Sequence, residues 1–493
     1  MDRKKRFELT QKILSELEAS DASSAKGNLS GRARLIALFD EGSFTPTSAY
    51  SKIGGDSPMA DELEGIFAGY GAINGRPAFA YAQDFTKLKG AFTSAQAAKI
   101  LNIYDLAQKN SAPIIAIFDS AGASIPEGLD VLGAYSAILA RAAALSGVIP
   151  QIAAICGICS GAAAMLAQMS DFAVIEKTNG QLFINSPFVL KAEGADADIG
   201  SADAALKNGM AALGADGDEG VLAQVKAILG HLPLNNSDEL TFCPNNDDAS
   251  RLTDGIAPLI TSDSYEMRNV ISQLADDGFF LELYPDCADN MLVGFASINS
   301  ISVGFVANQP SKYDGVICSA AARKAAKFIG ICDSFNLPVI TLTDTAGMAI
   351  SAEQEATLAL DSAKLAYAYA AATVPKVTVI CGKAYGSAYS IMGSKQLGAD
   401  VVFALPTAEI SIMAPESAVN FVWKDKISAG EDHAVLNDKW SAEIASPIAA
   451  AKAGHIDAII KPEQTRARIA AALEMLSCKK VCTPEKKHFN FPI

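Results

Sequence analysis

The sequence predicts an α/β protein built as a tandem duplication of one domain. Two apolar runs rich in Val, Ile and Leu, APIIAIFD at 112–119 and LPVITLTD at 337–344, each begin beside a proline. Such runs are typical of parallel strands that helices cover on both faces. The second observation is a repeat at a constant offset of 225 residues, which relates Ile73 to Ile298 and Ala163 to Ala388. A repeat held over this length without a gap indicates two copies of one fold.

Each copy has the same predicted order of elements. A helix comes first, followed by two strands, a second helix with apolar residues at helical spacing, and the first buried strand. A Gly/Ala loop, a long Ala-rich helix and a second buried strand follow, and a small-residue turn then opens another helix. This alternation predicts right-handed βαβ units. The ranges in the two copies are 32–39 and 266–275 for the first helix, 69–84 and 293–309 for the paired strands, 97–108 and 321–335 for the second helix, and 149–157 and 374–382 for the second buried strand.

The joint between the copies is predicted near residues 235–254. This segment, NNSDELTFCPNNDDASRLTD, is dense in polar and turn-forming residues, as domain linkers are. We therefore expect two domains, residues 1–245 and residues 246–493.

Length and charge narrow the function classes. The chain has 493 residues, with 40 Lys and Arg against 55 Asp and Glu, and a formal net charge of −15. This balance argues against nucleic acid and anionic membrane as partners, because both need basic patches. No apolar run reaches the ~20 residues of a membrane span, and no apolar core follows the basic N-terminus as in a signal peptide. The sequence predicts a soluble, cytoplasmic protein.

The nine cysteines predict neither disulfides nor a metal site. Most lie in apolar stretches, where free cysteine behaves as a small buried hydrophobe in a reducing compartment. Cys156 and Cys159 have the spacing of metal ligands, but no second pair completes a set of four. Nothing links any of the four histidines to a thiol nucleophile, and the phosphate-loop, dinucleotide, zinc-protease and serine-hydrolase motifs are absent from the sequence.

Two small-residue loops recur in both copies, each at the carboxyl end of a predicted buried strand. They span 119–124 and 157–163 in the first copy, and 344–349 and 382–388 in the second. A helix that begins after such a turn points free N–H groups outwards. Two such donors form an oxyanion hole, which needs no ionisable side chain. Glycines that merely allow tight strand-to-helix turns are the alternative, and the duplication of both loops favours two oxyanion holes.

Many separate blocks, in the same order over nearly the whole chain, resemble the carboxyltransferase subunit of biotin-dependent acyl-CoA carboxylases and decarboxylases. This family includes the propionyl-CoA carboxylase β subunit, the transcarboxylase large subunit and the α subunit of methylmalonyl-CoA decarboxylase. The resemblance implies two crotonase-like domains of the ClpP/crotonase ββα-superhelix type. The blocks are 31–44, 83–86, 147–151, 307–310, 335–338, 374–377, 383–386, 406–410 and 477–480, with Lys486, His488 and Pro492 in the tail.

The resemblance also implies that the two oxyanion holes have different tasks. The N-terminal domain would hold the acyl-CoA thioester, the C-terminal domain of a facing protomer would hold biotin, and the relatives form ring-shaped hexamers. One hole would stabilise the thioester enolate and the other the oxyanion that develops on the biotin ureido group. The implied residues are Gly161 and Ala162, supported by Gly122 and Ala123, for the first hole, and Ser387 and Ala388, after Gly386 and supported by Gly347, for the second.

Several positions depart from the family's pattern. Ser124 replaces an arginine, and glycines are replaced at Ala121, Ala162 and Ser387. An N–H survives each replacement because only proline removes it, but we expect strain wherever the replaced glycine held φ above zero. Ser390 occupies the position that helps the family to select the acyl group. The resemblance therefore implies substrates of the malonyl-, methylmalonyl- or glutaconyl-CoA type without deciding among them.

Biotin is expected on another chain. The sequence has no Met-Lys-Met biotinylation site, no nucleotide-binding loop of a biotin carboxylase and no four-cysteine zinc ribbon. The resemblance thus implies a biotin carrier protein as partner, with either a biotin carboxylase or the subunits of a membrane decarboxylase. The compact length favours the decarboxylase type by analogy alone.

Two other functions stay open at this level. A crotonase-type hydratase or isomerase would need no biotin and would use a glutamate near the first hole, for which Glu127 is available. The duplicated second half and the block at 307–310 argue against this function. The other alternative is a non-catalytic assembly subunit, which the replaced glycines would allow.

Overall fold

The computed structural model describes residues 2–21, 29–48, 65–86, 88–194, 199–248, 250–262, 264–482, 484–485, 487 and 490. The tail residues Lys486, His488 and Pro492 lie outside these ranges. The chain divides into two units, Met1–Asp238 and Glu239–Ile493.

The first unit is organised around a mainly parallel sheet. Within the described ranges the sheet has seven strands in the order β1-β2-β3-β4-β5-β7-β9. β2 and β3 form an antiparallel hairpin, whereas β3, β4, β5, β7 and β9 run parallel. β4, β5 and β7 are buried along their whole length, as expected for strands covered on both faces. The bounds are Thr45–Pro46, Ile66–Ile73, Arg76–Gln83, Ile114–Phe118, Gln151–Ile155, Phe172–Glu176 and Leu213–Ala215, and a separate parallel pair joins β6 (Ile158–Ser160) to β8 (Gln181–Phe183).

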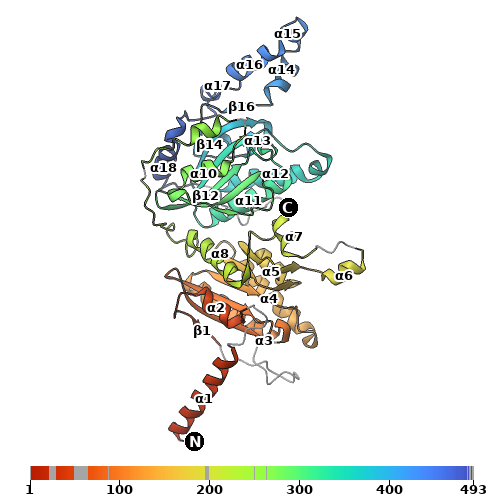
Figure 1. Ribbon diagram of the computed structural model, residues 1–493, viewed down its shortest axis with the longest axis vertical. Helices are drawn as coiled ribbons and strands as arrows, with labels where there is room; N and C mark the ends of the chain where they lie inside the picture. Colours follow the sequence, from red (N-terminus) through yellow and green to blue (C-terminus); the bar gives the residue numbers. More distant parts are fainter. Residues whose placement is uncertain are drawn as a thin grey trace. The chain divides into compact units, whose positions relative to one another are not determined.

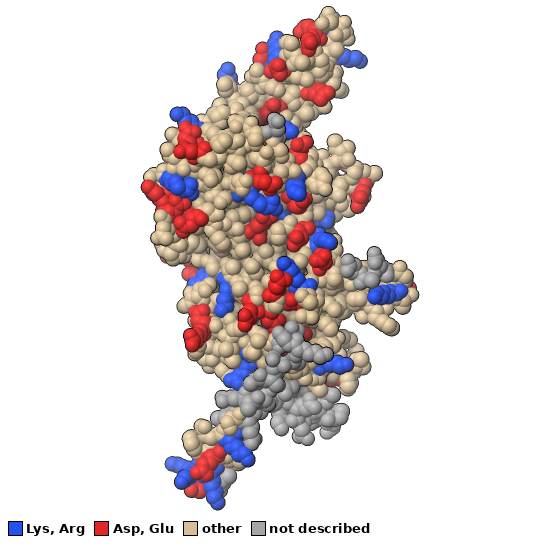
Figure 2. Space-filling model, viewed as in Figure 1, with Lys and Arg blue, Asp and Glu red and all other residues tan. Residues whose placement is uncertain are grey.

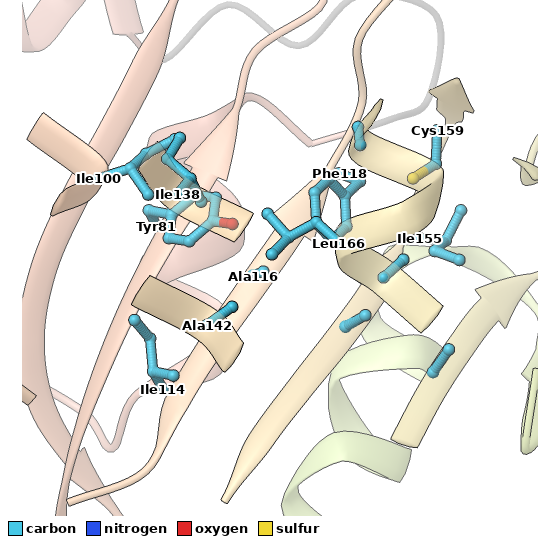
Figure 3. Close-up of a cluster of buried hydrophobic side chains, with 14 of the residues drawn as sticks. Tyr81, Ile100, Ile114, Ala116, Phe118, Ile138, Ala142, Ile155, Cys159 and Leu166 are labelled. Carbon is cyan, nitrogen blue, oxygen red and sulfur yellow. The ribbon is translucent and has the colours of Figure 1, made fainter. Parts of the chain in front are cut away.

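Helices cover this sheet and close its core (Figure 1). α3 packs on β2 and β3, α4 packs on α3 and α5, and α2 and α8 pack on each other and on the sheet. Figure 3 shows how the strand residues Tyr81 and Phe118 meet side chains of α3, α4 and α5 in one buried cluster. The helices are α1 (Arg3–Asp21), α2 (Gly31–Leu38), α3 (Ser94–Asn110), α4 (Leu129–Leu145), α5 (Ala162–Met169), α6 (Pro187–Ala192), α7 (Ala202–Lys207) and α8 (Gly217–His231).

The second unit repeats this plan. Its main sheet, in the part of the chain that the structure describes, follows the order β10-β11-β12-β13-β14-β15-β17, and β16 pairs with β14. β11 and β12 are the antiparallel hairpin, and β12, β13, β14 and β15 run parallel. The bounds of β10 to β17 are Leu281–Leu283, Met291–Ile298, Ile301–Asn308, Val339–Thr345, Lys376–Tyr385, Val401–Ala404, Glu409–Ser411 and Ala458–Ile459.

Helices of the second unit fall into two groups. α11 and α12 pack on each other, and α10 and α18 contribute to a core with the sheet. α14, α15 and α16 stand beyond β16, away from the sheet of this unit (Figure 1), around a small core of their own that includes Trp440. The helices are α9 (Ile256–Ile260), α10 (Met267–Leu274), α11 (Ser319–Ser334), α12 (Ala352–Ala371), α13 (Gly386–Ile391), α14 (Pro415–Val422), α15 (Lys424–Ser428), α16 (His433–Glu443), α17 (Pro447–Lys452) and α18 (Thr465–Met475).

Local sequence explains where the main helices begin. The Thr93 side chain accepts the N–H of Gln96, so α3 starts at Ser94 rather than at the predicted Ala97. Ser351 caps α12 in the same way, by accepting the N–H of Gln354. The predicted α/β class and tandem duplication are confirmed, because both units place equivalent hairpins, parallel strands and helices in the same order.

Basic and acidic side chains are interspersed on the face shown in Figure 2. This arrangement differs from the one-sign basic stripe that nucleic-acid binding requires.

Candidate active site

The predicted loops of the first unit lie at one edge of its sheet. β4 ends at Phe118 and leads into loop 119–124, and β5 ends at Ile155 and leads through β6 to the start of α5. β4 and β5 pair in parallel. Their carboxyl ends therefore meet at the same edge, where ligands of parallel sheets bind.

A neighbouring segment fixes the first loop. The N–H of Phe92 donates to the carbonyl oxygen of Gly122 at 2.8 Å, and the N–H of Ser124 donates to the carbonyl oxygen of Phe92 at 2.8 Å. Gly122 has φ +116° and donates its own N–H to Ser120 Oγ at 3.1 Å. The N–H of Ala123, between these bonds, donates to no group of the described chain. This amide is therefore free for a ligand.

The second loop supplies a second free amide. Gly161 has φ +60° and ψ −127°, and its N–H donates to the carbonyl oxygen of Phe183 at 2.9 Å. α5 begins at the next residue, Ala162. The first amides of a helix have no acceptor within it, and the structure pairs the Ala162 N–H with no other described group.

Both amides open onto one cavity of about 980 Å³, a volume at the upper end for small-molecule sites. All four residues predicted for this hole, Gly122, Ala123, Gly161 and Ala162, line the cavity. Tyr135 of α4 forms part of the wall, and its ring stacks on Phe92 with 4.0 Å between centroids. Burial raises the pKa of the Tyr135 hydroxyl, which therefore stays neutral. The remaining lining includes Leu132, Lys177, Phe183, Ile184, Ser186 and Phe188.

The second unit repeats these hydrogen bonds. The N–H of Ile317 donates to the carbonyl oxygen of Gly347 at 2.9 Å, and the N–H of Ala349 donates to that of Ile317 at 2.9 Å. Gly347 has φ +132° and donates its N–H to Thr345 Oγ1 at 3.2 Å. Each partner lies 225 residues after its counterpart in the first unit. The amide equivalent to that of Ala123 is therefore the N–H of Met348, which has no acceptor among the described groups.

A cavity of about 740 Å³ adjoins the second pair of loops. Gly386, Ser387 and Ser390 line it, with Tyr389, Trp440 and His455. Gly386 has φ +59°, and Ser387 corresponds by offset to Ala162, so its amide is the one equivalent to the hole donor of the first unit. Ala388 is fully buried and Gly347 lies in the adjoining loop, so neither contributes to this lining as described.

The replaced glycines do not strain the loops. The glycines that remain, Gly122, Gly161, Gly347 and Gly386, are those with positive φ. Ala121, Ala162 and Ser387 are absent from the described non-glycine residues with positive φ. The strain expected at replaced glycines is therefore wrong for these positions, because the replacements fall where any residue is accommodated.

The glutamate of the hydratase alternative is engaged elsewhere. Glu127 Oε2 accepts the N–H of Ser94 at 2.8 Å, at the first turn of α3. This bond satisfies a helix N-terminal amide, and Glu127 is not among the residues that line the first cavity.

The cysteines are free thiols: Cys156 and Cys159 are fully buried, and burial raises the pKa of both. The structure groups no three His, Cys, Asp or Glu residues as metal ligands within its described ranges. No helix among the described residues has the length and apolar character needed to cross a bilayer.

Sequence reasoning missed the segments that hold the hole loops. Phe92 and Ile317 were not singled out, and neither was the amide of Met348. The available signal was the duplicated Gly90 and Gly315, where a Cβ would overlap the backbone at Asp119 and Asp344. These glycines allow the close approach that brings Phe92 and Ile317 to the hole loops.

Comparison with known proteins identifies relatives of nearly the full chain. Residues 22–491 match the carboxyl transferase domain. The chain is 38% identical over 482 residues to methylmalonyl-CoA decarboxylase subunit alpha of Veillonella parvula, covering 95% of this chain and 94% of the relative. It is 38% identical over 501 residues to the propionyl-CoA carboxylase beta chain of Saccharopolyspora erythraea, covering 95% and 91%.

A solved structure has the same fold. The transcarboxylase 12S crystal structure, a hexamer with methylmalonyl-coenzyme A and methylmalonic acid bound, superimposes with a TM-score of 0.95 and 36% sequence identity. The match covers 100% of this chain and 99% of that one.

Proposed function

The chain belongs to the carboxyl transferase family, and from this premise we propose how its two cavities share the reaction. The predicted crotonase-like duplication is confirmed by the structural match. The activity of the family to which the chain belongs is biotin-dependent carboxyl transfer to or from an acyl-CoA. The finer proposal is that the first unit receives the acyl-CoA and the second receives biotin, presented by a separate carrier protein.

In the first cavity, the amides of Ala123 and Ala162 bind the thioester oxygen. When the carboxyl group leaves or arrives, negative charge develops on this oxygen, and fixed N–H donors stabilise the resulting enolate more than the ground state. The observation that carries this proposal is the convergence of two free amides, from two adjacent loops, on the wall of one cavity. The stacked Phe92 and Tyr135 rings hold the first of these loops in place.

In the second cavity, the amides of Met348 and Ser387 bind the ureido oxygen of biotin. The duplication of every hydrogen bond that fixes the first hole supports this assignment. The cavity wall includes apolar residues and aromatic rings, among them Tyr389 and Trp440. Biotin is written here as a substrate; it supplies the nitrogen that accepts or releases the carboxyl group, whereas the chain supplies donors and a site shielded from water.

The names of the relatives support a short-chain acyl-CoA. Relatives act, by their names, on methylmalonyl-CoA or propionyl-CoA. We propose methylmalonyl-CoA first and malonyl- and glutaconyl-CoA next as the carboxylated thioesters of this chain. The proposal includes a homohexamer like transcarboxylase 12S, a cytoplasmic location, and a biotin carboxylase or membrane decarboxylase subunits as further partners.

The test is a substrate panel with the purified chain and free biotin. Loss of each carboxylated thioester is followed with and without biotin. We expect turnover of at least one thioester that requires biotin. Turnover without biotin, or exchange of the α-hydrogen alone, would support the hydratase or isomerase instead.

A further inference from the structure

A buried aspartate opens the first loop of each copy. Asp119 and Asp344 are each 7% exposed and lie 225 residues apart in sequence. Neither carboxylate lines a cavity as described. Substrate contact therefore does not explain why a costly buried carboxylate stands at both positions.

Each carboxylate reaches across to the second loop of its own copy. Asp344 Oδ1 accepts the N–H of Lys383 at 2.9 Å, and the Asp119 carboxylate accepts the N–H of Ile158. The residue before each donor is glycine, and a Cβ added at Gly157 or Gly382 would overlap the carboxylate. The same contact between the two loops is thus built twice.

The two aspartates are held from behind by different chemistry. Asp119 Oδ2 forms an ion pair with Arg34 Nη1 at 2.8 Å, and Arg34 Nε also contacts Asp218 at 2.9 Å. Asp344 Oδ2 instead accepts the hydroxyl of Tyr265 at 2.8 Å. Because unrelated partners support the same loop-to-loop bond, that bond is the feature common to both sites.

The loop-to-loop bond lies where hole geometry is decided. Each oxyanion hole takes one amide from the first loop and one from the second, and the spacing of the two amides sets how well they bind one oxygen. We propose that Asp119 and Asp344 are positioning residues, each of which ties the two loops of its hole together and fixes that spacing. The proposal rests on the oxyanion-hole function and deepens it.

Asp344 gives the cleaner test, because its printed partners are the uncharged donors of Tyr265 and Lys383. Asp344→Ala removes the acceptor, Asp344→Asn keeps one acceptor oxygen, and Tyr265→Phe removes only the support from behind. Asp40 offers a matched control, because it also accepts two backbone amides, those of Asn74 at 3.1 Å and Gly75 at 2.8 Å, but at the β2–β3 turn.

Carboxyl transfer by the full oligomer is measured with Tm recorded for every variant. We expect Asp344→Ala to lower kcat at least about tenfold with KM for the acyl-CoA unchanged, since a misplaced donor weakens transition-state binding. Asp344→Asn recovers part of this loss and Tyr265→Phe retains most of the activity. Asp40→Ala lowers Tm and leaves kcat at the wild-type value.

The outcomes separate the two levels of the argument. Asp344→Ala and Asp344→Asn with wild-type kcat would overturn the positioning role while leaving the proposed function intact. So would Asp40→Ala, if it lowered kcat as much as Asp344→Ala for the same loss of Tm. A wild-type chain without biotin-dependent transfer would instead overturn the proposed function and, with it, this inference.

Discussion

Replacing Ala162 with proline removes one hole donor and little else. Ala162 is the first residue of α5, where the fixed φ of proline fits and no helix hydrogen bond is lost. Proline disfavours the α region at the residue before it. Gly161, with φ +60° and ψ −127°, lies outside that region. The substitution therefore deletes a free N–H without disturbing the turn.

The expected loss follows from the role of the amide. Removing one oxyanion-hole donor lowers turnover about 10²- to 10³-fold, or about 2.7–4 kcal/mol of transition-state stabilisation. Stability should change by less than about 1 kcal/mol, because this amide has no intramolecular partner to lose.

The first unit offers a matched control at the start of α4. Gly128 has φ +58° and ψ −124°, nearly the values of Gly161, and is followed by the first helical residue, Leu129. Leu129 is 81% exposed and is absent from the lining of the first cavity as described. Leu129→Pro therefore repeats the backbone change away from the proposed hole.

The assay is biotin-dependent loss of the carboxylated thioester by oligomers of confirmed size. Ala162→Pro should fall at least about 100-fold while Leu129→Pro keeps the wild-type rate. Equal rates in the two variants, or full activity of Ala162→Pro, would refute the assignment of this amide to the oxyanion hole.

Three further predictions address the second hole, the glycine turn and pH. Ser387→Pro should lower turnover about 10²- to 10³-fold with KM for the acyl-CoA unchanged; a raised KM with normal kcat would speak against a hole there. Gly161→Ala meets no atom within 4 Å yet should destabilise by about 1–3 kcal/mol through its φ, whereas Gly133→Ala in α4 should stabilise by about 0.4–1 kcal/mol, as measured by urea unfolding. Burial lowers the pKa of His231 from 6.5 to about 4, so the unfolded chain binds the proton more readily, and stability should fall by up to about 3 kcal/mol as pH drops from about 6.5 towards 4. His231→Gln should flatten this dependence of Tm on pH, and an unchanged dependence would show that another group causes it.

The duplicated strands and turns could be predicted because their signals are local. Continuous apolar runs indicate buried parallel strands, and Gly161 and Gly386 stand where the backbone takes positive φ. The repeat then joined these local signals into two equivalent sites.

Contacts between distant segments carried no such signal. The bond from Phe92 to Gly122 and the ion pair from Arg34 to Asp119 depend on how strands and helices assemble. The predicted donor Ala388 likewise stays untested, and the offset points instead to Ser387 as the counterpart of Ala162. The helices α14 to α16 lie outside the repeated motifs, so the duplication gave no expectation for them.

The most direct test of two cooperating holes is carboxyl transfer between methylmalonyl-CoA and free biotin, measured for the wild type, Ala162→Pro and Ser387→Pro. The account predicts turnover that requires biotin in the wild type and is lost in each variant, with oligomer size unchanged. Turnover that persists without biotin, or that survives either substitution at the wild-type rate, would contradict it.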